Sequence, residues 1–183
     1  MNFLESKVSG AWTIEPTPHT DHRGRFFRAW CVEEFAAHGI HFTPLQANMG
    51  TSHQAGTVRG MHYQVAPAEE AKLVRCTRGA VFDVLVDLRP GSVTYGQWFG
   101  TELSAGNARM LYVPPLCAHG YQTLEHEAEI LYMTSALYRP DAERGLRFDD
   151  PTVGIAWPLP PQALSDQDLR WPFLEPATSR ATP

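Results

Sequence analysis

Five polar residues lie in or beside segments that otherwise read as β-strands, and their side chains are of kinds that move protons. They are His62, Lys72, His119, Tyr132 and Asp168. Each alone is more often an exposed, core or capping residue than a catalyst. Together they would form a candidate active site if one barrel interior received an imidazole, an ammonium, a phenol and a carboxylate.

The chemistry of that set is acid–base catalysis without a metal ion. His62 would act as a general base, with a carboxylate that holds its tautomer and stabilises the imidazolium. Tyr132 would act as an acid on the other side of a bound substrate, and Lys72 would stabilise a developing oxyanion. A base and an acid on opposite faces, with an enolate stabiliser between them, can invert a carbon next to a carbonyl group.

Other kinds of site are poorly supported by the sequence. Small metal-binding barrels often carry a His-x-His pair, but here the second position is Gln64, which is a poor ligand for transition metals. His62 and His119 alone are too few to hold a metal, so we expect none. The chain has no G-x-S-x-G elbow, no G-x-G-x-x-G pattern and no P-loop, which argues against a serine nucleophile, bound NAD and a Walker-type ATP site.

The segment 59–64, RGMHYQ, should place its side chains alternately on the two faces of a strand. His62 and Gln64 would then share one face with Gly60, and Arg59 would lie on the other. A bulge at Gly60 would bring Arg59 round to the face of His62.

Length, net charge and cysteine content limit the classes of protein to which the chain can belong. Its 183 residues suffice for one domain with a core, and the net charge of −5 argues against a general nucleic-acid binder. Three cysteines without paired spacing fit reduced thiols in a cytosolic protein. We find no secretory signal and no apolar run long enough to span a membrane, so we expect a cytoplasmic protein.

The elements that must position the candidate residues are mostly strands. Prolines and glycines divide the chain into short pieces rich in Val, Phe, Tyr, Trp and Thr. The expected strands lie within residues 11–17, 24–30, 41–50, 56–64, 71–79, 80–89, 95–103, 108–115, 119–124 and 128–138. One helix is expected at 32–39, closed by Gly39. This pattern predicts an all-β fold, a jelly-roll (cupin-like) barrel or sandwich with few short helices.

Two further local patterns bear on packing. Along 81–88 the residues Phe82, Val84, Val86 and Leu88 are all apolar and should face a core, and 91–96 reads as a hairpin connection. We expect a single domain over 1–183. Its proline-rich C-terminal segment, 158–183, carries too many large apolar residues to be a free tail and should pack on the barrel.

Several ordered motifs make the chain similar to a known family. They are DHRGRFFRAW, QANMGTS, GTVRGMHYQ, AKLVRCTRGAVFDVLVDLRPGSVTYGQW, LYVPPLCAHGYQTL, EILYMTSALYRPDAERGLRFDDPTVGIAWP and LSDQD. In this order, over roughly residues 10–168, they resemble the dTDP-4-dehydrorhamnose 3,5-epimerase family of nucleotide-sugar isomerases.

The resemblance implies a jelly-roll homodimer with exchanged N-terminal strands, and an enzyme without metal or cofactor that acts on a dTDP-4-keto-6-deoxy sugar. By matching position it makes His62 the general base, Asp168 its carboxylate partner, Tyr132 the acid and Lys72 the enolate stabiliser. It places further residues against the substrate. Those near the sugar and phosphates are Arg59 and His119, those contacting the nucleotide and pyrophosphate are Arg23, Phe26, Gln46 and Asn48, and Tyr138 is a further aromatic contact.

The chain departs from the family pattern at Arg25, Arg28, Leu116, Cys117 and Met133, none of which is a proton-transfer residue. Alternatives therefore stay open beside the double epimerase. One is a single-site epimerase acting at C3 or C5 in antibiotic or polysaccharide sugar biosynthesis, and a ketoisomerase on the same fold is another. A non-catalytic cupin that binds a sugar or nucleotide and a metal-dependent cupin are alternatives from other classes.

Overall fold

The structure, a computed structural model, describes residues 1–174. Its strands are β1 (Asn2–Glu5), β2 (Trp12–Glu15), β3 (His19–Asp21), β4 (Gly24–Phe26), β5 (Gln46–Ser52), β6 (Val58–Gln64), β7 (Lys72–Arg78), β8 (Ala80–Asp87), β9 (Trp98–Ser104), β10 (Met110–Val113), β11 (Cys117–Thr123), β12 (Ala128–Thr134) and β13 (Glu143–Gly145). Its helices are α1 (Val32–Ala36) and α2 (Asp166–Arg170).

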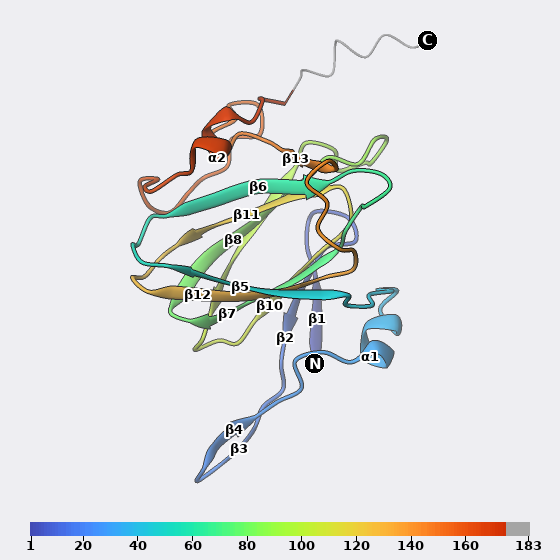
Figure 1. Cartoon of the computed structure of the whole chain (residues 1–183). Coiled ribbons are helices and arrows are strands. Elements are labelled where there is room, and N and C mark those ends of the chain that lie inside the picture. Colours follow the sequence, from blue (N-terminus) through green and yellow to red (C-terminus); the bar gives the residue numbers. More distant parts are fainter. Residues whose placement is uncertain (175–183) are drawn as a thin grey trace.

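The main strands form two antiparallel sheets that face each other (Figure 1). One sheet has the order β1-β2-β10-β7-β12-β5 and the other has the order β13-β6-β11-β8-β9. The expected all-β jelly roll is confirmed. β3 and β4 form a separate hairpin that projects from the barrel (Figure 1), and no described helix is long and apolar enough to cross a membrane.

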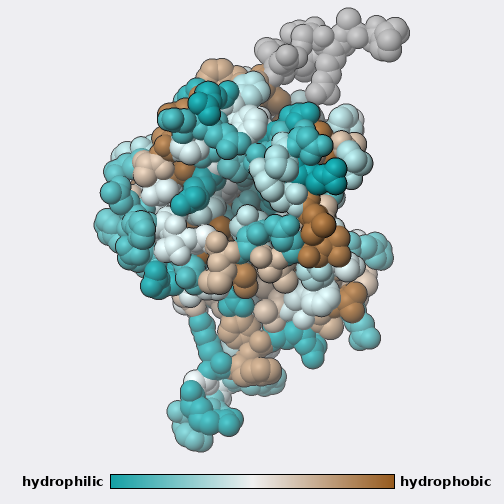
Figure 2. Space-filling view, in the orientation of Figure 1, coloured by the Kyte–Doolittle hydropathy of each residue, from teal (hydrophilic) through white to brown (hydrophobic). Residues whose placement is uncertain are grey.

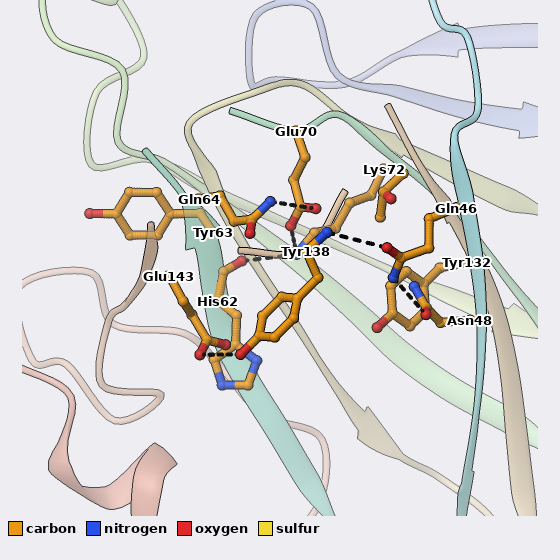
Figure 3. Close-up of a pocket in the computed structure, with 11 residues that line it drawn as sticks. Gln46, Asn48, His62, Tyr63, Gln64, Glu70, Lys72, Tyr132, Tyr138 and Glu143 are labelled. Atoms are coloured by element: carbon orange, nitrogen blue, oxygen red, sulfur yellow. Dashed lines mark hydrogen bonds and ion pairs between the residues drawn. The ribbon is translucent and has the colours of Figure 1, made fainter. Parts of the chain in front are cut away.

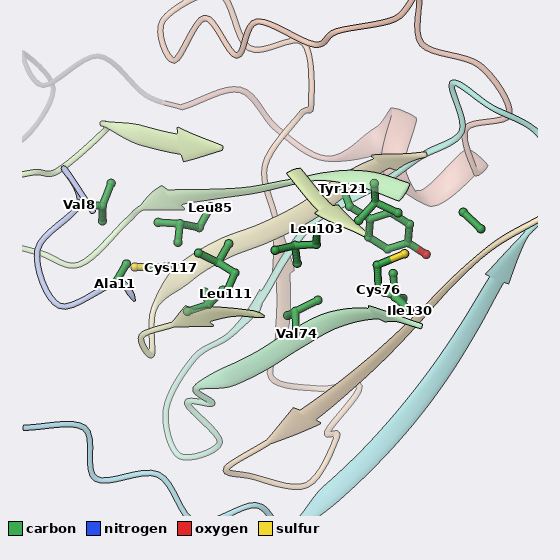
Figure 4. Packing of buried hydrophobic residues seen from close by; sticks show 13 residues of the cluster. Val8, Ala11, Val74, Cys76, Leu85, Leu103, Leu111, Cys117, Tyr121 and Ile130 are labelled. Atoms are coloured by element: carbon green, nitrogen blue, oxygen red, sulfur yellow. The ribbon is translucent and has the colours of Figure 1, made fainter. Parts of the chain in front are cut away.

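The space between the sheets is filled by one apolar cluster with members from both. Val74, Leu111 and Ile130 come from one sheet, and Leu85 and Tyr121 come from the other (Figure 4). All five are nearly inaccessible to solvent, so their burial supplies much of the hydrophobic stabilisation of the barrel. The cluster fixes the separation of the sheets and thereby the width of any cleft between them.

Strand β8 is buried on both faces, which explains its apolar sequence. Val84 and Val86, from the set expected to face a core, pack in a second cluster with Leu146, Val153 and other residues that follow β13. That cluster lies on the outer side of the sheet, beneath the C-terminal part of the chain. The barrel interior receives the alternate set instead, and this set includes the fully buried Asp83.

Turns and glycines decide where the elements end. α1 stops at Ala36, earlier than expected, and Gly39 follows with the positive φ of +73° that leads the chain out of the helix. β5 starts only after Pro44, since proline has no N–H to donate to a sheet ladder. Residues 91–96 connect β8 to β9 as the hairpin pattern indicated.

Candidate active site

A bulge in β6 places two candidate residues on one side of the sheet. His62 pairs with His119, and Arg59 pairs with Tyr121. Between these two pairs β6 therefore contains one residue more than β11, which defines the bulge. Gly60 sits in the bulge with φ of +133°, and a Cβ there would lie 2.6 Å from the Cα of Gly120. Arg59 and His62 consequently line the same cavity, as the bulge predicted at Gly60 requires.

Two adjoining cavities open between the sheets, with volumes of about 280 Å³ and 580 Å³. The face of the molecule is hollowed between β6 and β5, with mostly hydrophilic side chains around the opening (Figure 2). Three residues line both cavities: His62, Lys72 and Tyr132. The smaller one, here the first cavity, is also lined by Gln46, Asn48, Tyr63, Gln64, Glu70, Thr134, Tyr138 and Glu143. The larger, second cavity is lined by Arg59, His119, Tyr121 and the C-terminal segment 163–168, among others.

His62 and Asp168 form a close pair although they are 106 positions apart. The Nε2 of His62 lies 2.6 Å from Oδ1 of Asp168, whose side chain is almost fully buried. Burial would raise the pKa of Asp168, but hydrogen bonds from His62, Ser165 and the backbone outweigh it and lower that pKa. A carboxylate that stays ionised accepts the Nε2–H, which leaves the lone pair of His62 on Nδ1.

Tyr132 approaches the cavities from the sheet opposite His62 (Figure 3). Burial raises the pKa of its phenol, and the carboxylates Glu70 and Glu143 raise it further. The phenol is therefore protonated at neutral pH and able to give up a proton. An imidazole on one sheet and a phenol on the other face the same two cavities.

Lys72 is buried at the start of β7 and lines the cleft, which accounts for a lysine at a buried position of the strand. Its Nζ donates to the carbonyl of His62 at 3.2 Å and lies 3.1 Å from Oε1 of Glu70. These contacts fix the ammonium beside His62, where a negatively charged oxygen on a substrate would meet it.

The second histidine of the cleft has its own carboxylate. Nε2 of His119 lies 2.8 Å from Oδ1 of the fully buried Asp83. His62 and His119, which are register partners, therefore each contact a carboxylate through Nε2. Within residues 1–174 we find no group of three or more His, Cys, Asp or Glu side chains placed to hold a metal ion.

Gln64, which stands where a second metal-binding histidine would be, has a structural task. Its Nε2 donates to the carbonyls of Ala68 and Leu137 and to Glu70, and its Oε1 accepts from the N–H of Arg139 at 2.6 Å. The amide thus ties two loops together at the wall of the first cavity.

Gln46 and Asn48, expected near the nucleotide and pyrophosphate, line the first cavity together with Tyr138, expected as a further aromatic contact of the substrate. Gln46 donates to Oδ1 of Asn48 at 2.9 Å and accepts from the backbone N–H of Tyr138 at 3.2 Å. The hydroxyl of Tyr138 donates to Glu143 at 3.0 Å (Figure 3). Glu143 was not expected, because it lies in a three-residue strand without an alternation signal.

Glu70 and Tyr121 were also missed from the sequence. Glu70 lies in the loop before β7, where strand alternation does not apply, so the sequence held no signal for it. Tyr121 follows His119 by two residues, the spacing at which strand side chains share a face, and both line the second cavity.

The structure does not bring Arg23 and Phe26 into either cavity of this chain. Both lie on the β3–β4 hairpin, where Arg23 pairs with Asp21 at 2.6 Å. The side chain of Phe26 is 77% exposed.

Comparisons with family models and with curated proteins identify the same group of enzymes. A family model described as dTDP-4-dehydrorhamnose 3,5-epimerase matches residues 5–176. The curated protein of that name from Sinorhizobium fredii is 42% identical to this chain, over 95% of this chain and 90% of its own length. A curated dTDP-4-dehydrorhamnose 3-epimerase from Streptomyces niveus is 41% identical, over 88% of this chain and 78% of its own length.

The fold is shared with solved structures as well. The crystal structure of dTDP-4-dehydrorhamnose 3,5-epimerase from Bacillus anthracis with TDP and pyrophosphate bound superposes with a TM-score of 0.91 at 36% identity. The match covers 94% of this chain and 99% of that one.

Proposed function

The chain belongs to the dTDP-4-dehydrorhamnose 3,5-epimerase family, and from its cleft we propose that it inverts C3 and C5 of a dTDP-4-keto-6-deoxyhexose by acid–base proton transfer. The observation that supports this most directly is the placement of His62 and Tyr132. They come from opposite sheets and line the same two cavities.

The proposed reaction uses the acidity that the 4-ketone gives to its neighbouring C–H bonds. His62 takes the proton through Nδ1, the C–H electron pair moves toward the ketone oxygen, and an enolate forms. Lys72 stabilises the negative oxygen. Tyr132 then donates a proton to the opposite face of the carbon, which reverses its configuration. The imidazolium of His62 releases its proton to solvent and Tyr132 takes one up, which restores both groups.

Asp168 supports the base in this scheme. Its carboxylate holds His62 in the tautomer with Nε2 protonated and stabilises the imidazolium after proton transfer. We propose that Arg59 and His119 contact the sugar and phosphates from the second cavity. In the first cavity, Gln46 and Asn48 are proposed to contact the nucleotide and pyrophosphate, and Tyr138 is proposed as a further aromatic contact of the substrate.

Epimerisation at one carbon only is the second candidate, and the similarity to the Streptomyces niveus 3-epimerase favours it. Incubation with dTDP-4-keto-6-deoxyglucose in heavy water separates the two. Each inverted carbon takes its new hydrogen from solvent, so we expect NMR to show deuterium at both C3 and C5. Deuterium at one carbon would establish a single-site enzyme, and none at either carbon would refute the proposed function.

We further propose that two copies of the chain assemble and exchange their N-terminal hairpins. Every residue of β3 and β4 is exposed, and an isolated two-stranded hairpin is marginally stable in water. On the outer face of the larger sheet, the half-buried Arg75 has no ion-pair partner within residues 1–174 and contacts the ring of Phe27, 5.3 Å away. A second copy would cover both features and bring its Arg23 and Phe26 to this chain's cleft.

Mixed assemblies test that exchange. When Arg23→Ala and His62→Ala chains are co-expressed, a dimer of one of each contains one intact site if Arg23 serves the partner's cleft. Statistical pairing then restores about a quarter of the wild-type activity. The two variants purified separately are the controls. Activity of the co-expressed sample no higher than that of the separate variants would show that Arg23 does not act on the partner's site.

We also infer one domain over residues 1–183 and a cytoplasmic location. The segment before α2 is hydrogen-bonded to the barrel, with Val58 donating to Gln162 and Gln122 donating to Leu159. The end of the expected C-terminal segment, 175–183, lies outside the described residues. Three free cysteines agree with the reduced thiols of a cytosolic protein.

A further inference from the structure

Trp171, the residue directly after α2, lies against the imidazole of His62. The two ring centroids are 6.1 Å apart and the planes meet at 66°, an edge-to-face arrangement. Trp171 lines neither cavity. The cavity residue that its ring faces edge-to-face is His62.

The indole of Trp171 packs into a notch that exists because residue 145 is a glycine without a side chain. Gly145 on β13 is the register partner of His62 on β6, and a Cβ built on Gly145 would overlap the indole of Trp171. Both neighbours of the indole are thus fixed by the sheet. The ring's Nε1 is buried without a hydrogen-bond partner within residues 1–174, so packing and not hydrogen bonding places the ring.

The turn that carries Trp171 is anchored on each side. Arg147 donates through its side chain to the carbonyl of Leu169 at 2.9 Å, and through its backbone to the carbonyl of Pro172 at 3.0 Å. Leu169 and Pro172 flank Arg170 and Trp171. The same short stretch therefore presents both the carboxylate and the indole to His62.

The packing of Trp171 against His62 adds a second restraint on the imidazole, beside its hydrogen bond to Asp168. The hydrogen bond to Asp168 fixes His62 at Nε2 but leaves the ring free to rotate about that contact, which would swing Nδ1 away from the reacting carbon. An aromatic neighbour at this distance opposes the rotation. Small errors in the aim of a catalytic group are costly in rate.

We propose that Trp171, seated in the notch at Gly145, is a positioning residue that holds the imidazole of His62 in the orientation for proton abstraction. The inference rests on the proposed role of His62 as the base. It assigns a function to the residue after α2 that is separate from the carboxylate of Asp168.

Two variants remove the contact independently. Trp171→Leu removes the ring, and Gly145→Ala fills the notch and displaces it. Each should lower kcat about three- to tenfold, the effect of an edge-to-face aromatic contact, with KM and dTDP affinity unchanged. Trp171→Phe should recover most of the kcat because it keeps an aromatic ring in the notch.

Trp157→Leu is the matched control. Trp157 also follows β13, is also partly buried and also makes an edge-to-face contact, with Phe82 at 6.5 Å. Phe82 lines neither cavity, whereas His62, the partner of Trp171, lines both. Loss of Trp157 should lower the melting temperature comparably and leave kcat unchanged. Equal kcat for Trp171→Leu and Trp157→Leu, or loss of kcat in step with dTDP affinity, would overturn the inference. Failure of the wild-type protein to epimerise would instead refute the proposed function.

Discussion

Replacing His62 with alanine is expected to abolish the incorporation of solvent deuterium into a dTDP-4-keto-6-deoxy sugar while dTDP still binds. The imidazole of His62 is paired through Nε2 with an ionised carboxylate, which leaves its Nδ1 lone pair free, and unlike His119 it lines both cavities. Without it no base removes the proton next to the ketone. Loss of general base catalysis corresponds to about 10²- to 10⁴-fold in rate.

The measurement is deuterium content by NMR, combined with dTDP affinity by calorimetry. His53→Ala is a suitable control, because His53 is an exposed histidine that pairs with Glu127 at 3.1 Å and lines neither cavity. That variant should exchange at the wild-type rate. Undiminished exchange in His62→Ala would remove His62 from the role of base.

Replacing Tyr132 with phenylalanine should separate proton exchange from inversion. The ring packs against the core cluster and is retained, so the barrel should stay intact. His62 can still remove a proton and return deuterium to the same face, whereas delivery to the opposite face loses its donor. We expect inverted product to form about 10²- to 10⁴-fold more slowly while deuterium continues to enter the substrate.

The phenol of Tyr132 is protonated at neutral pH, as an ordinary tyrosine is, and its raised pKa extends that range upward. The rates of exchange and of inversion should be followed in the same sample in heavy water. Tyr112→Phe, which removes a buried phenol from a cluster outside the cleft, is the matched control and should alter neither rate. If Tyr132→Phe slows exchange and inversion equally, the phenol is not the group that delivers the proton.

Local sequence patterns were enough to predict the class of fold and much of the cleft. Strand-forming composition between glycines and prolines placed His62, Lys72 and Tyr132 on strands, and Gly60 indicated the bulge that adds Arg59. These features depend on residues within one strand, since side-chain direction repeats every second residue. Strands β1, β3 and β13 were not predicted, because a run of three or four residues is too short to show a period by itself.

Helix α2 was not predicted, although the sequence contains a capping signal at its start. Ser165 caps the helix by accepting from the backbone N–H of Asp168 at 3.1 Å, and a serine followed three residues later by an acidic residue is a known sign of a helix start. The cap orders the turn on which Asp168 lies. Reading it would have predicted the helix, although not the histidine that Asp168 reaches.

The sequence by itself determined which chemical groups the barrel carries and which face of its own strand each occupies. Only the tertiary structure decided which groups meet: Asp168 with His62, Asp83 with His119, and Trp171 with Gly145. The reason is that alternation acts between neighbours in the chain, whereas these contacts depend on the order of strands in a sheet and on the path of the C-terminal segment across it. Those arrangements are set by the packing of the whole core, which no single segment encodes.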